Sequence, residues 1–305
     1  MDAIRADHLK KTFGQILAVD NVNLLINEGE TFGFLGPNGA GKTTTIRLLT
    51  GVLTPDVGTV YINGINIHRH PLDAKIQMGV IPESSTVYGD LSAEQNLQLS
   101  GKMYGMPRAL RHERIDEILS RLGLSEKRRN LVRTFSKGMK QRVSIACAII
   151  HRPPVLFLDE PTSGLDVQSR RLVIETIRDM NEQGSTIFLT THNIEEANTL
   201  CQTVCIINKG KIIAQDSPER LKKMFDTTQS VEVSFDRPVT RDLFVVEGIL
   251  RAEPCGDKWR LYTDNPDRVL KYLVKRAERE SIGITSLTTS GPSLEEAFVQ
   301  LTECL

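Results

Sequence analysis

The stretch FGFLGPNGAGKTTTIRLL, residues 32–49, decides the fold. Its first four residues are a short apolar run, residues 36–43 (GPNGAGKT) fit the pattern GxxxxGK[ST], and Thr44 to Leu49 continue as a helix. Strand, glycine-rich loop and helix follow one another in the order that a P-loop requires. The sequence therefore predicts an α/β fold with a phosphate-binding loop after a buried strand.

The loop residues have separate expected tasks. Glycines let the backbone curl so that successive N–H groups point inward at phosphate oxygens, and the helix N-terminus adds the positive end of its dipole. Lys42 is expected to reach the β- and γ-phosphates, and the Thr43 hydroxyl to bind Mg²⁺. An ordinary glycine-rich turn before a helix is the alternative, but the flanking residues favour a nucleotide site. The residues assigned to it are Gly36, Pro37, Asn38, Gly39, Ala40, Gly41, Lys42, Thr43 and Thr44.

A second motif is PPVLFLDEPTSGLD, residues 153–166. Val155 to Leu158 form a continuous apolar run, which is typical of a buried parallel strand. Ligands of open α/β sheets bind beyond the carboxyl ends of the strands. Asp159 is therefore expected to hold the Mg²⁺ bound by Thr43, and Glu160 to polarise a water molecule against the γ-phosphate. Two solvated acids at a strand end are the alternative.

The third motif, STIFLTTHNIEEA at residues 185–197, contains another apolar strand, Ile187 to Leu189. His192 follows it at the carboxyl end. A lone histidine is more often structural than catalytic, but a strand end of the same sheet favours contact with the γ-phosphate. Glu160 and His192 are thus the predicted catalytic residues.

Taken together and in this order, these motifs resemble the nucleotide-binding subunit of an ABC transporter over residues 3 to 225. The resemblance implies a P-loop NTPase domain at residues 1–225, with a parallel-sheet core, an antiparallel β-subdomain and a helical subdomain at about residues 84–150. It also implies ATP and Mg²⁺ as cofactors. Phe13 matches the aromatic residue that stacks on adenine in the family; a plain core phenylalanine is the alternative.

Two further positions are assigned by the resemblance. Glu83, in MGVIPESS, falls where most of the family has a glutamine that touches Mg²⁺ and the attacking water. A carboxylate can accept a metal or water contact, but it cannot donate a hydrogen bond and it adds negative charge. Asp166 matches the loop that crosses to the partner subunit.

The stretch FSKGM, residues 135–139, stands where the family has the signature LSGGQ. Ser136 is an acceptable helix N-cap, and an apolar stripe at Val143, Ala146, Cys147 and Ile150 follows it. In the family this helix points at the γ-phosphate held by the other subunit, which assigns Ser136, Lys137, Gly138 and Met139 to a site in trans. One P-loop and one signature per chain imply two chains sandwiching two ATP molecules. A homodimer is expected, with a heterodimer of related chains left open.

Amphipathic helices are expected between residues 84 and 135. Ser92 and Gln95 form a capping box before one helix, and Pro107 opens a second, basic helix. Its arginines could form a nucleic-acid patch, but acidic residues interrupt them, so a solvated helix face is preferred.

The sequence pattern of residues 226–305 differs from that of the residues before them and predicts a small C-terminal α/β domain. Strands are expected at 231–235, 259–263 and 284–289, a helix from about Pro266 to Arg279, and a last helix after a capping box of Ser293 and Glu296. This tail resembles those of export-type ATPase subunits of the daunorubicin-resistance kind, including sodium and multidrug exporters. Trp259 and Tyr262 are expected in the core or an interface. The domain is expected to stabilise the dimer or to regulate docking.

Composition limits the classes of partner that the chain is expected to bind. Lys plus Arg and Asp plus Glu both number 38, so no global field attracts nucleic acid or anionic lipid. No apolar run is long enough for a signal peptide or a membrane span. The cysteines lack a paired CxxC spacing, which favours reduced, mostly buried thiols in the cytosol. The cysteines are Cys147, Cys201, Cys205, Cys255 and Cys304.

The expected function is ATP hydrolysis that powers a separate integral membrane permease, from the cytoplasmic side of the membrane and through contact with that permease. An exporter of a drug, antibiotic, ion or lipid-like substrate is expected from the tail. One alternative is a soluble ABC ATPase acting on ribosomes or DNA; such relatives usually carry two cassettes or a long coiled coil. A nucleotide sensor without turnover would lack the catalytic acid, whereas Glu160 and His192 are present.

Overall fold

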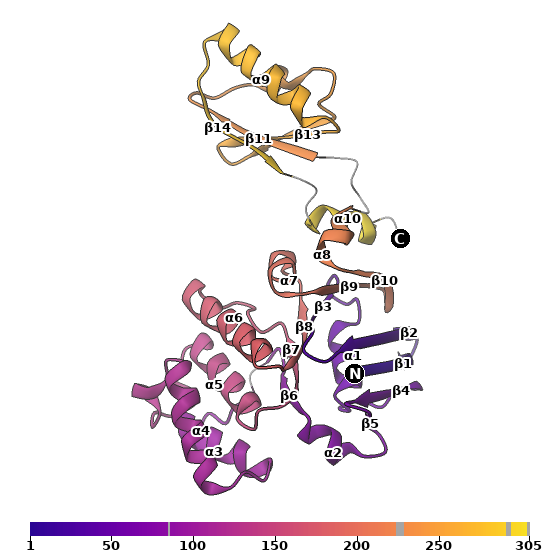
Figure 1. The fold of residues 1–305 in the computed structure, drawn as a ribbon, viewed down its shortest axis with the longest axis vertical. Coiled ribbons are helices and arrows are strands. Elements are labelled where there is room, and N and C mark those ends of the chain that lie inside the picture. The colour runs from indigo at the N-terminus through magenta and orange to yellow at the C-terminus, as the bar shows by residue number, and fades with distance from the viewer. Residues whose placement is uncertain (85, 224–228, 291–293, 304–305) are drawn as a thin grey trace. The chain divides into compact units, whose positions relative to one another are not determined.

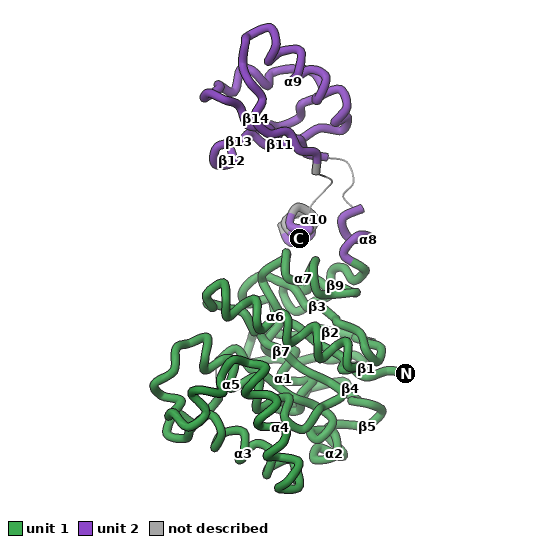
Figure 2. Tube along the Cα trace, turned by 60° about the vertical axis from the view of Figure 1, so that its left-hand side comes forward, with its two compact units in different colours: residues 1–217 green, residues 218–305 purple. Residues whose placement is uncertain are grey.

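The computed structural model describes residues 1–84, 86–223, 229–290 and 294–303. The chain divides into two compact units, residues 1–217 and residues 218–305 (Figure 2). Each unit contains a hydrophobic core of its own. The division falls just before helix α8 (Pro218–Lys223), whereas the predicted boundary after residue 225 lies outside the described residues and stays a prediction.

The first unit is built on a six-stranded sheet in the order β10-β9-β3-β8-β7-β6 (Figure 1). Pairing is parallel from β9 to β6, and β10 joins antiparallel to β9. Every residue of β3, β7 and β8 is buried, as expected for parallel strands covered on both faces. The strands are β3 (Thr31–Leu35), β6 (Met78–Ile81), β7 (Val155–Asp159), β8 (Thr186–Thr191), β9 (Thr203–Asn208) and β10 (Lys211–Asp216).

The order of these strands assembles the three sequence motifs. Strand β8 lies between β3 and β7, and all three run in the same direction. Their carboxyl ends therefore meet at one edge of the sheet. The glycine-rich loop follows β3, the Asp159–Glu160 pair ends β7, and His192 follows β8.

A second sheet is antiparallel, with strand order β2-β1-β4-β5. Helix α1 (Lys42–Leu49) contacts β2 and β4 of this sheet and β7 of the core sheet. Figure 1 shows α5 (Lys137–Ile149) and α6 (Val167–Glu182) on the other side of the core sheet. The strands of this sheet are β1 (Asp2–Phe13), β2 (Ile16–Asn27), β4 (Val57–Ile62) and β5 (Ile65–Asn66). The unit also contains α2 (Pro71–Ile76), α6 (Val167–Glu182) and α7 (Ile194–Leu200).

Helices fill the segment before the Asp159 strand. The predicted capping box is confirmed: Gln95 N–H donates to Ser92 Oγ at 3.2 Å, and Ser92 N–H donates to Gln95 Oε1 at 2.8 Å. Pro107 directly precedes the basic helix as predicted. The elements are α3 (Ala93–Met103), α4 (Arg108–Arg121), η1 (Ser125–Lys127), η2 (Val132–Thr134) and α5 (Lys137–Ile149).

Helix α5 begins where the variant signature predicts a helix. The Ser136 hydroxyl accepts a hydrogen bond from Met139 N–H at 3.3 Å, so Ser136 is the N-cap. Of the predicted apolar stripe, Val143, Ala146 and Ile150 are buried and Cys147 is half-buried. The stripe holds α5 against the rest of the unit.

The second unit contains a four-stranded antiparallel sheet in the order β12-β13-β11-β14. Along the chain the elements run strand, 3₁₀ helix, strand, strand, helix, strand, which is the ferredoxin-like order with η3 in place of the first helix. The predicted strands and helix are confirmed. They are β11 (Gln229–Phe235), η3 (Arg241–Phe244), β12 (Arg251–Cys255), β13 (Lys258–Thr263), α9 (Pro266–Glu280) and β14 (Ile284–Ser290).

Strand β12 was not predicted, because RAEPC is charged and contains Pro254. A proline lacks the ladder donor, and β12 lies at the edge of its sheet, where proline is tolerated. Trp259 packs on Phe244 in the core, with ring centroids 4.8 Å apart. Helix α10 (Leu294–Glu303) contacts α8, and the predicted capping residue Ser293 lies outside the described residues.

The expectation of reduced, mostly buried thiols is confirmed in part. Cys201 and Cys205 are buried, Cys147 is half-buried, Cys255 is exposed, and all four are free. Burial raises the pKa of Cys147 and of Cys201 to about 12, which keeps both protonated. Cys304 lies outside the described residues. Within the described part of the chain, no helix has the length and apolar character needed to cross a bilayer.

Candidate functional site

The glycine-rich loop between β3 and α1 needs glycine for two physical reasons. Gly39 and Gly41 have φ angles of 81° and 107°, which side chains disfavour. At Gly36 a Cβ would lie 2.4 Å from the carbonyl oxygen of Ile207, and at Gly41 one would lie 2.5 Å from that of Ala18. The loop is therefore packed closely against β9 and β2, and the N-terminus of α1 follows it directly.

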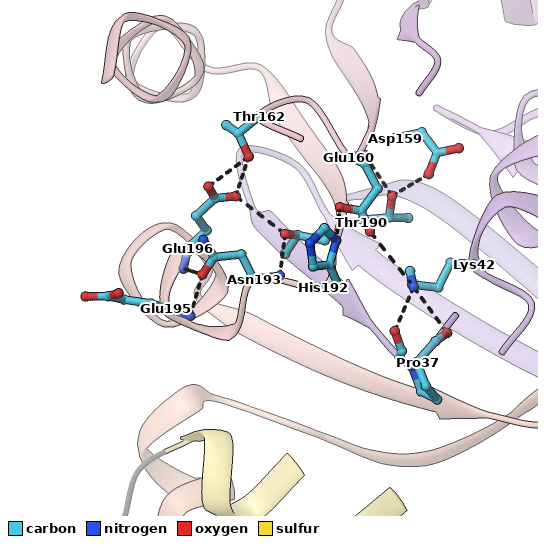
Figure 3. A network of polar contacts seen from close by, with 12 residues as sticks. Pro37, Lys42, Asp159, Glu160, Thr162, Thr190, His192, Asn193, Glu195 and Glu196 are labelled. Carbon is cyan, nitrogen blue, oxygen red and sulfur yellow. Dashed lines mark hydrogen bonds and ion pairs between the residues drawn. The ribbon is translucent and has the colours of Figure 1, made fainter. Parts of the chain in front are cut away.

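The side chain of Lys42 folds back onto the glycine-rich loop. Its Nζ donates to the carbonyl oxygens of Gly36 at 2.6 Å and Pro37 at 3.3 Å, and lies 3.9 Å from Glu160 Oε1 (Figure 3). Burial lowers the pKa of Lys42, and the nearby carboxylates of Glu160, Asp159 and Glu83 oppose that shift. A cation held inside the loop is positioned to meet a bound phosphate group.

Glu160 and His192 form a hydrogen-bonded pair across two strand ends. His192 Nδ1 lies 2.7 Å from Glu160 Oε2 (Figure 3). The Glu160 side chain is only 10% exposed, whereas that of His192 is 62% exposed. Burial raises the pKa of Glu160, against the opposing charges of His192 and Lys42. The structure thus joins the two predicted catalytic residues, and a carboxylate with a raised pKa suits proton transfer.

Asp159 is oriented differently from its neighbour. Its carboxylate is buried and accepts a hydrogen bond from Thr190 Oγ1 at 2.5 Å. The residue does not line the cavity that contains Glu160. The structure therefore places Asp159 at the carboxyl end of β7, outside the lining of the cavity.

A cavity of about 860 Å³ opens over the loop. It is large enough for a nucleotide, since ligand sites commonly span roughly 300–1,000 Å³. Predicted residues that line it are Pro37, Asn38, Gly39, Gly41, Lys42, Thr43, Thr44, Glu83, Glu160 and His192. Predicted residues absent from its lining are Phe13, Gly36, Ala40 and Asp159.

Phe13 is placed at the end of β1 and is 46% exposed. Lys11 Nζ lies 5.7 Å from the centroid of its ring. The exposure speaks against the core alternative, because a core phenylalanine is buried. An adenine contact stays a prediction.

Six lining residues were not predicted from the sequence. Lys209 and Gly210 form a turn after β9 with φ angles of 46° and 79°. Gly210 N–H donates to Ala40 O at 3.0 Å, and Asp20 N–H donates to Gly210 O at 2.9 Å, so the turn joins the glycine-rich loop to β2. The sequence feature that could have indicated this turn is NKGK, at residues 208–211. The six residues are Ile16, Leu17, Ala18, Ser163, Lys209 and Gly210.

The signature residues lie elsewhere. None of Ser136, Lys137, Gly138 and Met139 lines the cavity of the same chain. They adjoin the loop before α6 instead: a Cβ on Gly138 would lie 2.3 Å from Ser169 Oγ, and one on Gly164 would lie 2.4 Å from Lys137 Nζ. Asp166 caps α6, accepting from Ser169 N–H at 2.9 Å and from Ser169 Oγ at 2.8 Å. The predicted signature residues and the predicted partner-crossing loop thus lie side by side.

Comparison with known proteins agrees with this geometry. A sequence profile of the family described as ABC transporter matches residues 19–163. The Nod factor export ATP-binding protein I of Cupriavidus metallidurans is 40% identical, over 97% of this chain and 95% of that protein. The daunorubicin resistance ATP-binding protein DrrA2 of Streptomyces coeruleorubidus is 33% identical, over 98% of this chain and 95% of that protein.

A solved structure shares the fold of most of this chain. The dimeric structure of MJ0796, a bacterial ABC transporter cassette, is 27% identical, with a TM-score of 0.65. The match covers 70% of this chain and 98% of that one.

The fold, the phosphate loop and these likenesses define the class: the chain belongs to the ABC transporter family. Within it the chain is an ATP-binding subunit of the export type, which confirms the resemblance seen in the sequence. It is an ATPase whose hydrolysis is coupled to transport.

Proposed function

We propose that two copies of this chain sandwich two ATP molecules, each held by the glycine-rich loop of one copy and the α5 N-terminus of the other. The observation that carries the proposal is the separation within one chain: the nucleotide cavity contains the loop, Glu160 and His192 but none of the signature residues. The dimeric cassette among the similar structures supports the same arrangement. Two identical chains would form a closed two-fold assembly.

Hydrolysis then follows from the chain's own groups. Glu160 orients a water molecule and accepts its proton as the water oxygen bonds to the γ-phosphorus; the bond from that phosphorus to the bridging oxygen breaks, and ADP keeps the electron pair. Lys42 and the loop N–H groups stabilise the charge on the phosphate oxygens. His192, hydrogen-bonded to Glu160, fixes the carboxylate and faces the γ-phosphate.

The residues near the loop fit a magnesium ion. Thr43 and Glu83 line the cavity with hard oxygen donors, and the Asp159 carboxylate lies at the adjoining strand end. Such donors suit Mg²⁺, which is bound by few protein carboxylates together with substrate phosphates. Thr43, Asp159 and Glu83 would hold the ion, which would neutralise charge on the phosphates.

The site acts with a membrane partner. We assign the chain to the cytoplasmic face of the membrane, bound to integral permease subunits that select the substrate. Nod factor and daunorubicin in the names of its relatives favour a drug-like or lipid-like exported substrate. The chain divides in this proposal into an ATP-binding domain at 1–225 and an accessory domain at 226–305 that stabilises the dimer or regulates docking.

A mixing experiment tests the shared site. A Lys42→Ala chain has a defective loop, and a Ser136→Arg chain has a blocked α5 N-terminus, so each homodimer is expected to be inactive. A heterodimer of the two contains one site with both defects and one site with neither. Co-expression is therefore expected to restore ATP hydrolysis. If a purified heterodimer does not hydrolyse ATP, or if the Ser136→Arg homodimer is fully active, the result would contradict a site shared between chains.

A further inference from the structure

The backbone of Glu160 is held in an unfavourable conformation. Its φ angle is 50°, in the left-handed region that non-glycine residues avoid. Its N–H donates to Thr190 O at 3.1 Å and to Thr190 Oγ1 at 3.2 Å. A residue remains in such a conformation only where its surroundings fix it. The contacts of Pro161 and Thr162, the next two residues, show what fixes the backbone of Glu160.

A buried carboxylate from another helix holds the turn. Glu196 lies in the first turn of α7 and is 6% exposed. Thr162 Oγ1 donates to its carboxylate, at 2.8 Å from each oxygen, and Thr191 Oγ1 lies 3.4 Å from Oε2 (Figure 3). Glu196 therefore connects the segment just after Glu160 with the residue just before His192.

Pro161, which lies between Glu160 and Thr162, is held by a residue of α5, the helix that begins at the variant signature. Gln141 Nε2, on α5, donates to Pro161 O at 3.0 Å, and Gln141 is buried. Residues 160, 161 and 162 are thus fixed in turn by β8, α5 and α7. A buried charge is costly to keep, and Arg170 Nε, at 3.8 Å from Glu196 Oε1, is its nearest cation among the described ion pairs. This cost favours a role for Glu196 beyond helix packing.

We propose that Glu196 is a positioning residue for ATP hydrolysis: through Thr162 it fixes the left-handed turn at Glu160 and sets Glu160 against His192. The inference rests on the proposed function, because it presupposes Glu160 as the proton acceptor. Neither Glu196 nor Thr162 lines the nucleotide cavity. Their removal should therefore slow turnover without weakening ATP binding.

The test compares two substitutions at one position in the full-length chain. Thr162→Val keeps the size but removes the hydroxyl, and Thr162→Ser keeps the hydroxyl. Small misplacement of a catalytic group costs up to about 100-fold in rate, so Thr162→Val is expected to lower kcat by about 10- to 100-fold at an unchanged KM for ATP. Thr162→Ser is expected to stay close to the wild type.

Two further variants separate positioning from folding. Thr199 lies on the exposed side of α7, the helix that carries Glu196, and its hydroxyl donates to Glu195 O at 2.7 Å. Thr199→Val removes this hydroxyl and is expected to leave kcat unchanged. Glu196→Gln keeps one acceptor oxygen for Thr162 and is expected to give an intermediate kcat, again at unchanged KM. It provides the test should Thr162→Val fail to fold.

Two results would overturn the proposal: wild-type kcat in Thr162→Val, or an equal loss of kcat in Thr162→Val and Thr162→Ser. A parallel Glu160→Gln variant distinguishes this from failure of the proposed function. If Glu160→Gln abolishes turnover while Thr162→Val does not, only the positioning role of Glu196 is wrong. If Glu160→Gln hydrolyses ATP at the wild-type rate, the proposed function itself is wrong.

Discussion

Gly138, the second glycine position of the variant signature, packs directly on Ser169 of α6: a Cβ at residue 138 would lie 2.3 Å from Ser169 Oγ. That oxygen donates to Asp166 Oδ2 at 2.8 Å. The glycine is therefore required by the contact between α5 and α6 inside one chain, before any nucleotide is considered. Ser136, as the helix cap, and Gly138 thus have structural roles inside one chain, whereas the Lys137 side chain is exposed and that of Met139 is half-buried, so these two positions can depart more easily from the family pattern.

Gly138→Ala is expected to destabilise the chain by about 1–3 kcal/mol, the usual cost of overpacking. Urea unfolding of the variant measures this. In a Ser169→Gly background the clash is removed, so the added methyl group should cost less there. An equal cost in both backgrounds would show that the contact with Ser169 is not the reason.

Lys42→Ala is expected to weaken ATP binding. A hydrogen bond to a charged group contributes roughly 1.5–3 kcal/mol, so the Kd for ATP should rise at least about tenfold by isothermal titration. Lys102→Ala, at the end of α3 and outside the cavity, is the matched control and should bind ATP as the wild type does. Undiminished affinity in Lys42→Ala would contradict the phosphate role of the loop.

Restoring the family signature tests whether the variant is functional. The Ser136 cap and the start of α5 are intact, so the phosphate-facing N–H groups and the helix dipole remain available. The double variant Lys137→Gly, Met139→Gln is therefore expected to change ATP hydrolysis little when the membrane partner is present. A large gain in activity would mean that the natural stretch is a handicap.

Acid should weaken the fold through His151. Its ring stacks on Tyr104 with centroids 3.5 Å apart, Nε2 lies 3.2 Å from Met78 O, and burial lowers its pKa to about 4. An unfolded histidine takes up a proton near pH 6.5. Between those values the unfolded state binds more protons, so the free energy of unfolding falls as pH falls. Below about pH 4 this effect is complete.

His151→Phe keeps a ring against Tyr104 and cannot be protonated. Its free energy of unfolding should therefore fall less between pH 6.5 and pH 4 than that of the wild type, as measured by urea titration at several pH values. An equally steep fall in both proteins would exclude His151 as the cause.

The sequence predicted the parts of the site that depend on local pattern. The loop, Asp159, Glu160 and His192 each follow an apolar strand, and parallel strands must bring their carboxyl ends to one edge. The left-handed turn at Glu160 and the contact between Gly138 and Ser169 could not be predicted, because they depend on how α5, α6 and α7 pack. The Lys209–Gly210 turn was missed for a related reason: its role becomes visible only when β9 lies beside β3.

ATP turnover by Glu160→Gln tests the central claim most directly. The amide preserves the shape of the side chain but cannot accept the proton of the attacking water. The variant is expected to bind ATP with wild-type affinity, to lose turnover, and to accumulate as an ATP-bound dimer measurable by light scattering. Hydrolysis at the wild-type rate would contradict the account, because Glu160 could then not be the group that activates the water.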